Sequence, residues 1–289
     1  MRKIGIGQSY YCNVYGFEAG LEKMKEQGYS AIDYQDFVNT ETPLFEKSFY
    51  EFEKYLREQV RIIGQNGLLI HQTHGPWRSP PRDVTQEDRD ERFDKMCRSI
   101  EGTAILGCNN MVIHPIMPFS TRDMEHAEET YEMNLEFMRR LTDVGREYGV
   151  TICYENMPMP NFSIATPDQI LRFVKEINDD YFRICLDTGH CRVVGVSPAD
   201  AVRLVGKEYL RALHIHDNNG LRDYHWSLYS GDIDWESFGK ALHEIEYEGV
   251  ISLEVKRNSK LPKMLYETEE LSLHRKAEYI AFLADGITL

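Results

Sequence analysis

Short apolar runs and longer amphipathic stretches alternate along the whole chain. The apolar runs resemble buried strands, because strands covered on both faces are apolar nearly throughout. They span residues 3–8, 30–35, 67–74, 110–114, 150–155, 182–187, 210–216 and 250–255. Strict alternation of this kind predicts parallel strands joined by helices, and eight units predict a closed (β/α)8 TIM barrel.

The stretches between these runs have the pattern of amphipathic helices. They span residues 15–27, 46–66, 88–106, 125–148, 167–178, 199–206 and 235–246, and a last helix at about 264–284 would complete the ring. The segment Thr166-Pro167-Asp168-Gln169 fits a capping box with proline in the first turn. No linker or break in composition divides the chain, so residues 1–289 are predicted to form a single domain.

The charge balance disfavours nucleic acid as a partner. The chain has 33 Lys and Arg residues against 47 Asp and Glu residues, a formal net charge of −14. Such a surface repels a phosphate backbone and offers little counterion release, so we expect a small-molecule partner.

The cysteines and the hydropathy pattern bear on the compartment. The six cysteines form no CxxC pair, and two of them lie inside buried-looking strands, so all six are expected to be reduced thiols. No apolar stretch approaches the roughly 18 residues of a membrane span, and the N-terminal residues do not resemble a secretion signal. We therefore expect a cytoplasmic protein.

Metal-binding side chains end four consecutive predicted strands, the fifth to the eighth. These residues are Glu155, Asp187, His214 and Glu254. Parallel strands of a barrel end on one face, so the four side chains should meet there. Three carboxylates and one imidazole suit Mn²⁺, Mg²⁺ or Co²⁺ and are acceptable to Zn²⁺. The alternative is that each acid pairs with a nearby Lys or Arg, but the strands contain few cations.

A second group of metal-binding or substrate-binding side chains surrounds the first. It consists of His74, His114, His190, Asp223 and His225. These residues could hold additional ions or contact substrate oxygens. His216 shares the facing of His214 and is ranked below it as a ligand. His126, His243 and His274 fall on predicted helices and are expected at the surface.

Several loop residues are candidates for substrate contact. Trp77 lies in a long loop after the third strand, which we expect to act as a lid over the substrate. Loop cations that could meet an anionic group are Arg78, Arg82, Lys256 and Arg257.

The strand-end segments carry a family resemblance. Six segments resemble those of the xylose isomerase-like TIM-barrel superfamily: YENMP, CLDTGH, LHIHD, LEV, VIHP and SGDIDW. That superfamily includes sugar and sugar-phosphate isomerases and epimerases, inosose dehydratases and the endonuclease IV family. The resemblance implies a divalent ion on Glu155, Asp187, His214 and Glu254. In the epimerase branch it also implies that Glu155 and Glu254 face opposite sides of the substrate and exchange its protons.

The endonuclease IV branch is similar to this chain in a different way. Its three-zinc pattern matches His74, His114, Glu155, Asp187, His190, His214, Asp223, His225 and Glu254. The loops after the second and third strands depart from that branch, because they do not form a basic DNA-contacting set, and the chain is strongly acidic.

We therefore expect a metal-dependent isomerase or epimerase of a small sugar or sugar phosphate, acting by proton transfer through an enediolate. Mn²⁺ or Zn²⁺ is the favoured ion, with one to three ions per chain, and a homo-oligomer is compatible with the sequence. Two alternatives stay open: an endonuclease IV-like multi-zinc phosphodiesterase, and a non-catalytic sugar-binding barrel.

Overall fold

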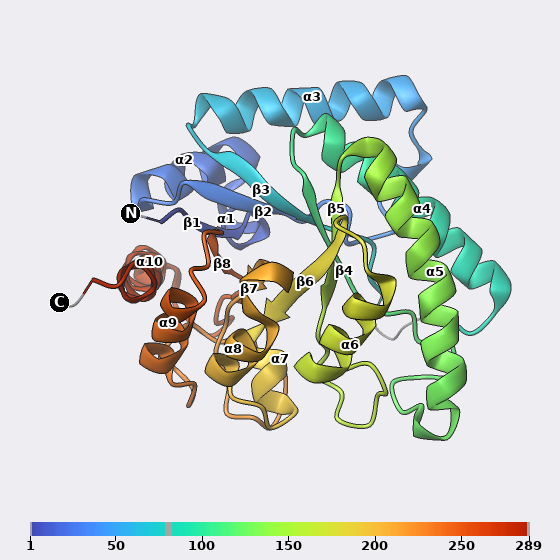
Figure 1. Cartoon of the computed structure of the whole chain (residues 1–289). Coiled ribbons are helices and arrows are strands. Elements are labelled where there is room, and N and C mark those ends of the chain that lie inside the picture. Colours follow the sequence, from blue (N-terminus) through green and yellow to red (C-terminus); the bar gives the residue numbers. More distant parts are fainter. Residues whose placement is uncertain (1, 79–82, 288–289) are drawn as a thin grey trace.

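Eight parallel strands form the centre of the protein in a computed structural model, which describes residues 2–78 and 83–287 (Figure 1). The strands are β1 (Ile4–Gly7), β2 (Ala31–Tyr34), β3 (Leu69–His74), β4 (Asn110–Ile113), β5 (Thr151–Glu155), β6 (Phe182–Asp187), β7 (Leu210–His214) and β8 (Ile251–Leu253). Their order is β7-β6-β5-β4-β3-β2-β1-β8, and a parallel bridge between Ile215 and Leu253 joins the two ends. The predicted single barrel and all eight of its strands are confirmed.

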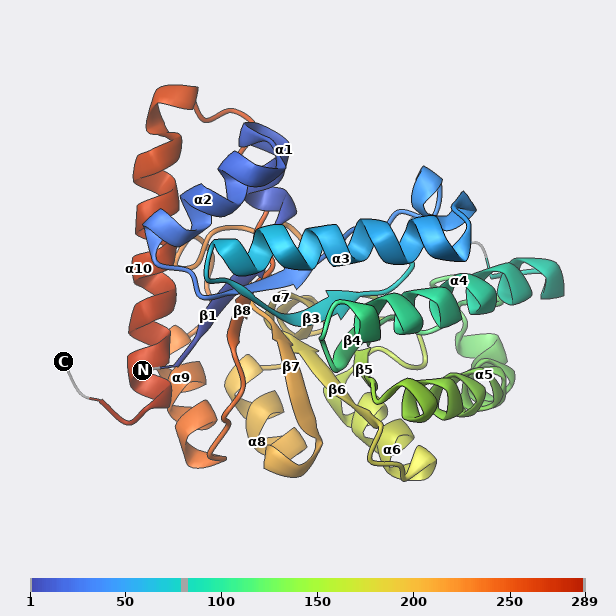
Figure 2. The same ribbon diagram turned by 90° about the horizontal axis from the view of Figure 1, so that it is seen from above.

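Helices surround the sheet and cover its outer face (Figures 1 and 2). The α-helices are α1 (Ser9–Tyr15), α2 (Phe17–Gln27), α3 (Phe49–Gln65), α4 (Gln86–Ile105), α5 (Ala127–Tyr148), α6 (Pro167–Ile177), α7 (Thr188–Val193), α8 (Pro198–Tyr209), α9 (Trp235–Glu244) and α10 (Tyr266–Ala284). Short 3₁₀ turns are η1 (Pro43–Glu46), η2 (Met124–His126) and η3 (Lys263–Leu265). The last helix, α10, contacts α9, α2 and β1 and completes the ring as predicted.

The capping box predicted at the start of α6 is present, with the Gln169 side chain accepting from the Thr166 backbone N–H at 2.9 Å. Sequence analysis missed the helices α1 and α7, because each is too short to show a helical repeat of apolar residues. Helix α7 begins directly after β6, and Asp187 caps it by accepting from the His190 backbone N–H at 2.6 Å. This cap holds His190 next to Asp187.

The interior of the barrel has an apolar layer below a polar one. Four small side chains from neighbouring strands form a separate apolar cluster: Val112, Cys153, Cys185 and Ala212. Side chains two residues apart on a strand face the same way. The residues two positions further along each strand therefore also face the interior, at the ends where the strands point: His114, Glu155, Asp187 and His214.

All six cysteines are free thiols, as expected. Burial raises the pKa of Cys153 and that of Cys108 to about 12, so these thiols stay protonated and unreactive at neutral pH. None of the helices in the described ranges is long and apolar enough to cross a membrane.

Candidate metal centre

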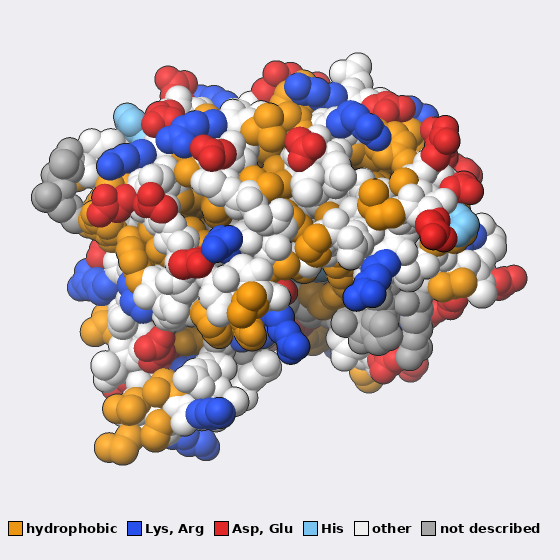
Figure 3. Space-filling model, turned by 90° about the horizontal axis from the view of Figure 1, so that it is seen from below, with side chains coloured by type: hydrophobic (Ala, Val, Ile, Leu, Met, Phe, Trp, Pro, Cys, Tyr) orange, Lys and Arg blue, Asp and Glu red, His pale blue; other side chains and the backbone are white. Residues whose placement is uncertain are grey.

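A cavity of about 530 Å³ opens at the ends of the strands. The space-filling view shows a face that is hollowed near its centre (Figure 3). Among the predicted site residues, the cavity is lined by His74, Trp77, His114, Glu155, His190, Asp223, His225 and Glu254. The barrel therefore gathers residues from six strands and their loops around one hollow.

The four predicted metal ligands converge beside this cavity. Each of Glu155, Asp187, His214 and Glu254 offers one ligand atom within 4.8 Å of all the others. The first three are fully buried, and the Glu254 side chain is 19% exposed. Glu254 follows the last residue of β8, so its ligand position depends on the turn out of the strand.

The chemistry of this group fits a divalent ion. Three carboxylates lie together, and within the described part of the chain no lysine or arginine forms an ion pair with any of them. Their partners are histidines, which carry no charge unless protonated. A hard cation with oxygen and imidazole ligands is the natural counter-charge for such a cluster.

Histidines surround the Glu155 carboxylate. Its Oε2 accepts from His114 Nε2 at 2.9 Å, and its Oε1 lies 3.0 Å from His214 Nδ1. Burial by itself raises the pKa of Glu155, but His214 and His114 offset this and hold it well below its usual range. Burial lowers the pKa of His214, but the Glu254 and Glu155 carboxylates together raise it well above its usual range. The Glu155 carboxylate is thus ionised and available as a ligand.

Asp33, a fully buried carboxylate in β2, contacts the site but is not among the residues predicted from the sequence. Its Oδ2 lies 2.9 Å from His214 Nε2 and accepts from Gln72 Nε2 at 3.2 Å. An acid inside the otherwise apolar run AIDY was the available signal, because a charge is rarely buried without a partner.

Asn156, which follows Glu155, was also missed. Its side-chain oxygen accepts from the Asp187 backbone N–H at 2.8 Å, and its Nδ2 donates to the Asp187 carbonyl at 3.1 Å. Its own carbonyl accepts from His190 Nδ1 at 2.7 Å. Asn156 therefore positions a predicted metal ligand and a predicted substrate-binding histidine together.

The predicted second group is split into two parts. One part contains His190, Asp223 and His225. The structure adds a fourth member, His216, which the sequence ranks below His214 as a ligand. Asp223 Oδ2 accepts from His225 Nε2 at 2.8 Å, and the His216 ring stacks on His225 with centroids 4.1 Å apart. Burial raises the pKa of Asp223, but His190 and His225 lower it strongly overall. These four side chains could hold another ion.

His74 and His114 lie on the other side of Glu155. His74 forms a potential metal-binding group with Glu155 and His214, and its Nε2 lies 3.7 Å from Glu155 Oε2. The His114 ring meets the His74 ring edge to face. The group that includes His74 shares Glu155 and His214 with the central ligands, so these two groups form one continuous site around the Glu155 carboxylate.

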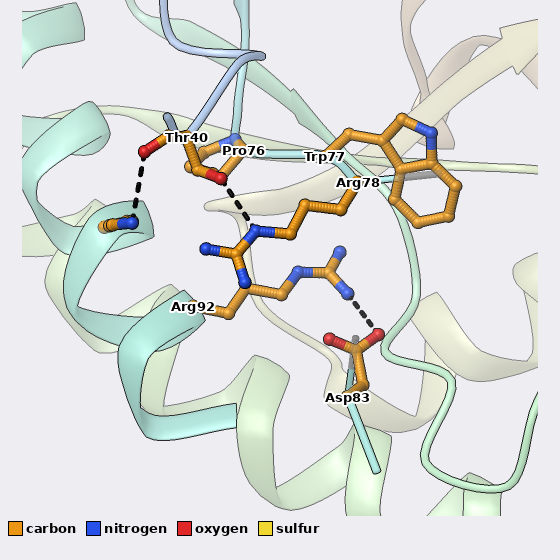
Figure 4. Close-up of a pocket in the computed structure, with 7 residues that line it drawn as sticks. Thr40, Pro76, Trp77, Arg78, Asp83 and Arg92 are labelled. Carbon is orange, nitrogen blue, oxygen red and sulfur yellow. Dashed lines mark hydrogen bonds and ion pairs between the residues drawn. The ribbon is translucent and has the colours of Figure 1, made fainter. Parts of the chain in front are cut away.

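Trp77 lines the cavity and packs edge to face on His114, with ring centroids 4.4 Å apart. Its other side borders a small pocket that also contains Arg78, Asp83 and Arg92 (Figure 4). Behind it, Arg92 donates to Asp83 at 2.7 Å and to the His114 carbonyl at 3.0 Å. This network ties the loop after β3 to the site. The predicted lid includes residues 79–82, which lie outside the described residues.

The remaining candidates from the sequence have different outcomes. Arg78 donates to Thr40 and forms an ion pair with Glu91, so it is already partnered (Figure 4). Arg82 lies outside the described residues. His126 and His243 are exposed as expected. The expectation for His274 is wrong, because this side chain is only 6% exposed and packs edge to face on Tyr29.

Comparison with known proteins agrees with this barrel. A family model described as the xylose isomerase-like TIM barrel matches residues 21–277. The chain belongs to this family.

Curated relatives differ in their names. The uncharacterized protein MJ1311 of Methanocaldococcus jannaschii is 31% identical over 70% of this chain and 69% of its own. A probable endonuclease 4 of Mycoplasmopsis agalactiae is 23% identical over 86% of this chain and 90% of its own. The D-psicose 3-epimerase of Agrobacterium fabrum is 22% identical over 87% and 84%.

Solved structures share the fold. A D-tagatose 3-epimerase-like protein superposes with a TM-score of 0.76 at 24% identity, covering 98% of both chains. The IolI protein with a bound zinc atom superposes with a TM-score of 0.75 at 19% identity, covering 99% of both. These similarities extend over the whole barrel.

Proposed function

We propose that the protein is a divalent-metal-dependent isomerase or epimerase of a small sugar or sugar phosphate. The observation that carries the proposal is the convergence of Glu155, Asp187, His214 and Glu254 beside a cavity of about 530 Å³. A cavity of this size suits a small ligand. The named epimerases among its relatives and the zinc atom in one structural neighbour support it.

The four converging residues would hold the ion, with Mn²⁺ or Zn²⁺ favoured and Mg²⁺ or Co²⁺ also compatible. When bound, the ion supplies positive charge that polarises the carbonyl and neighbouring hydroxyl of a sugar. Three groups of potential ligands are the basis for one to three ions per chain.

Proton transfer is assigned to Glu155 and Glu254. One glutamate takes the proton from the carbon next to the carbonyl, and the electron pair of that C–H bond moves into an enediolate. Both carboxylates line the cavity, and the Glu254 side chain is 19% exposed, so both lie where a substrate proton can reach them. Return of a proton to the same carbon on the opposite face gives an epimer. Return to the former carbonyl carbon gives an isomer.

Four cavity residues are assigned to substrate binding: His74, Trp77, His114 and His190. His190 Nδ1 is held by the Asn156 carbonyl, so contact with a substrate oxygen would fall to Nε2, which also lies 3.5 Å from Asp223 Oδ2. The Trp77 ring offers an apolar surface against a sugar ring.

Exchange of substrate hydrogen with solvent deuterium tests this proposal. Metal-loaded protein should exchange the hydrogen next to the carbonyl of at least one ketose or ketose phosphate. Glu155→Gln and Glu254→Gln should each lower the rate by about 10²–10⁴-fold, while Glu132→Gln on the exposed face of α5 leaves it unchanged. Absence of exchange across a panel of ketoses and their phosphates, with each of the four metals, would contradict the proposal.

A second candidate is a multi-zinc phosphodiesterase. It is favoured by the additional group of His190, His216, Asp223 and His225, and by the endonuclease 4 relative. The face drawn in Figure 3 intersperses acidic and basic side chains and has no continuous basic stripe for a nucleic acid. Three zinc ions per chain together with cleavage of an abasic-site duplex would favour this candidate over the isomerase.

A further inference from the structure

A second cavity of about 620 Å³ lies beside the candidate metal centre. The loops after β7 and β8 form it, and the two cavities share Val255 and Lys256 as lining residues. Lys256 is two residues beyond the predicted metal ligand Glu254. The two cavities therefore adjoin at Val255 and Lys256.

The walls of this cavity are held in place by hydrogen bonds. The Lys256 backbone N–H donates to the His225 carbonyl at 2.8 Å, which joins the two loops. Trp226 exchanges two backbone hydrogen bonds with Asp217, at 2.9 and 3.0 Å, and its ring stacks on Tyr224. Lys276 on α10 donates to Ser227 Oγ at 3.1 Å. The cavity thus has a defined shape.

Its lining is cationic in a chain that is acidic overall. Lys256 and Lys260 are exposed, and neither forms an ion pair with a described residue. One acidic residue among the lining residues described, Glu269, lies in the first turn of α10. The two unpaired lysines give this cavity a positive potential that favours binding of an anion.

Arg257 is the third cation of the lining and is nearly buried. Its side chain is 10% exposed, with the guanidinium 4.2 Å from the Tyr10 ring centroid and 4.4 Å from that of Tyr266. Nη2 donates to Glu270 at 2.7 Å, but Nε and Nη1 have no hydrogen-bond partner among the described residues. These two atoms are buried, so Arg257 adds positive charge beside the cavity rather than a direct contact to a ligand.

We propose that this second cavity binds the phosphate group of a phosphorylated sugar whose reacting carbons lie at the metal centre. The proposal rests on the isomerase or epimerase function and names its substrate class. A phosphate ester carries nearly two negative charges and three acceptor oxygens, which match the two exposed, unpaired lysines and the positive charge of the buried arginine beside them. In TIM barrels the loops after the seventh and eighth strands are a frequent place for phosphate.

Comparison of free and phosphorylated ketoses tests the substrate class. Hydrogen exchange should show a higher kcat/KM for a ketose 5- or 6-phosphate than for the same ketose without phosphate. In Lys256→Met/Lys260→Met the ratio of the two values should fall by about tenfold or more, because the charged contacts are lost. Lys240 is an exposed residue of α9 that lines neither cavity, so Lys240→Met should keep the wild-type ratio of the two kcat/KM values. Equal or better turnover of the free ketose, or preference for a sugar carboxylate, would overturn the proposal.

Binding of inorganic phosphate separates this proposal from the proposed function. Phosphate should bind the metal-loaded protein in a ³¹P NMR titration, with an affinity about tenfold lower in Lys256→Met/Lys260→Met and unchanged in Lys240→Met. Unchanged affinity in the double variant would overturn the phosphate site even when isomerase activity is present. Lysine-dependent phosphate binding without hydrogen exchange on any sugar would support the site and contradict the isomerase.

Discussion

Asp33 and His214 meet across the barrel, with Asp33 Oδ2 2.9 Å from His214 Nε2. A carboxylate accepts hydrogen bonds, so this contact keeps a proton on Nε2 and leaves Nδ1 for the metal centre. Nδ1 lies 3.0 Å from Glu155 and 3.4 Å from Glu254. The buried acid of β2 thereby orients a predicted ligand from β7.

We predict that Asp33→Asn weakens metal binding by about 10–100-fold, because a neutral amide no longer holds the ring and its proton as strongly. Competition with a chromogenic chelator measures the affinity. The same substitution at Asp143, an exposed residue of α5, serves as the control and should have no effect. Equal affinity in Asp33→Asn and wild type would show that Asp33 does not support the ligand.

Gly189 is required by close packing in α7. A Cβ atom there would lie 1.9 Å from the His216 ring, a distance that cannot be tolerated. Gly189→Ala should lower the free energy of unfolding by about 1–3 kcal/mol through overpacking. In contrast, Gly64→Ala in α3, where nothing lies within 4 Å, should raise it by about 0.5–1 kcal/mol. Urea denaturation measures both, and a neutral Gly189→Ala would contradict the packing argument.

The buried ion pair between Arg257 and Glu270 connects the loop after β8 to α10. Glu270 is fully buried, lies 2.7 Å from Arg257 and accepts from Tyr15. Glu270→Ala should destabilise the protein by about 3–5 kcal/mol, because a nearly buried guanidinium loses its counter-charge. Thermal or urea unfolding should show this loss. Glu58→Ala, which breaks an exposed pair with Arg61, should change stability little.

The stability of the metal-free protein should fall in mild acid through His71. Burial lowers the pKa of His71 from 6.5 to about 4, and its ring contacts Ser252 Oγ at 3.1 Å. The unfolded chain binds this proton more readily, so the contribution is complete above pH 6.5 and is lost as pH falls towards 4. The free energy of unfolding should fall by about 2–3 kcal/mol. The lower value takes account of solvent screening at this partly exposed side chain.

Urea denaturation in chelator at pH 7 and pH 4.5 measures this loss. His71→Asn should reduce the pH dependence without removing it, because burial also lowers the pKa of His114 to about 4. His243→Asn on the surface of α9 should leave the pH dependence as it is. An unaltered slope in His71→Asn would assign the acid sensitivity to other groups.

The histidines show how far the sequence could predict the site. His74, His114, His190 and His225, which the sequence groups together, all line the cavity. The sequence could not show that these histidines form two separate groups, because the grouping depends on the three-dimensional path of the loops that carry them. Asp223 and His225 reach His190 from the long connection after β7, and His225 does so with a positive φ of 51°.

The sequence alone determined the barrel, its strands and the side chains that end them, because apolar periodicity and the two-residue repeat of a strand are local properties. Val112, Cys153, Cys185 and Ala212 mark the inward positions, and side chains of the candidate site follow two residues later. Only the tertiary structure decided what those side chains meet. Asp33 and His214 are 181 residues apart, and no local pattern relates them. Their contact exists because closure of the sheet brings the ends of β2 and β7 to the same interior.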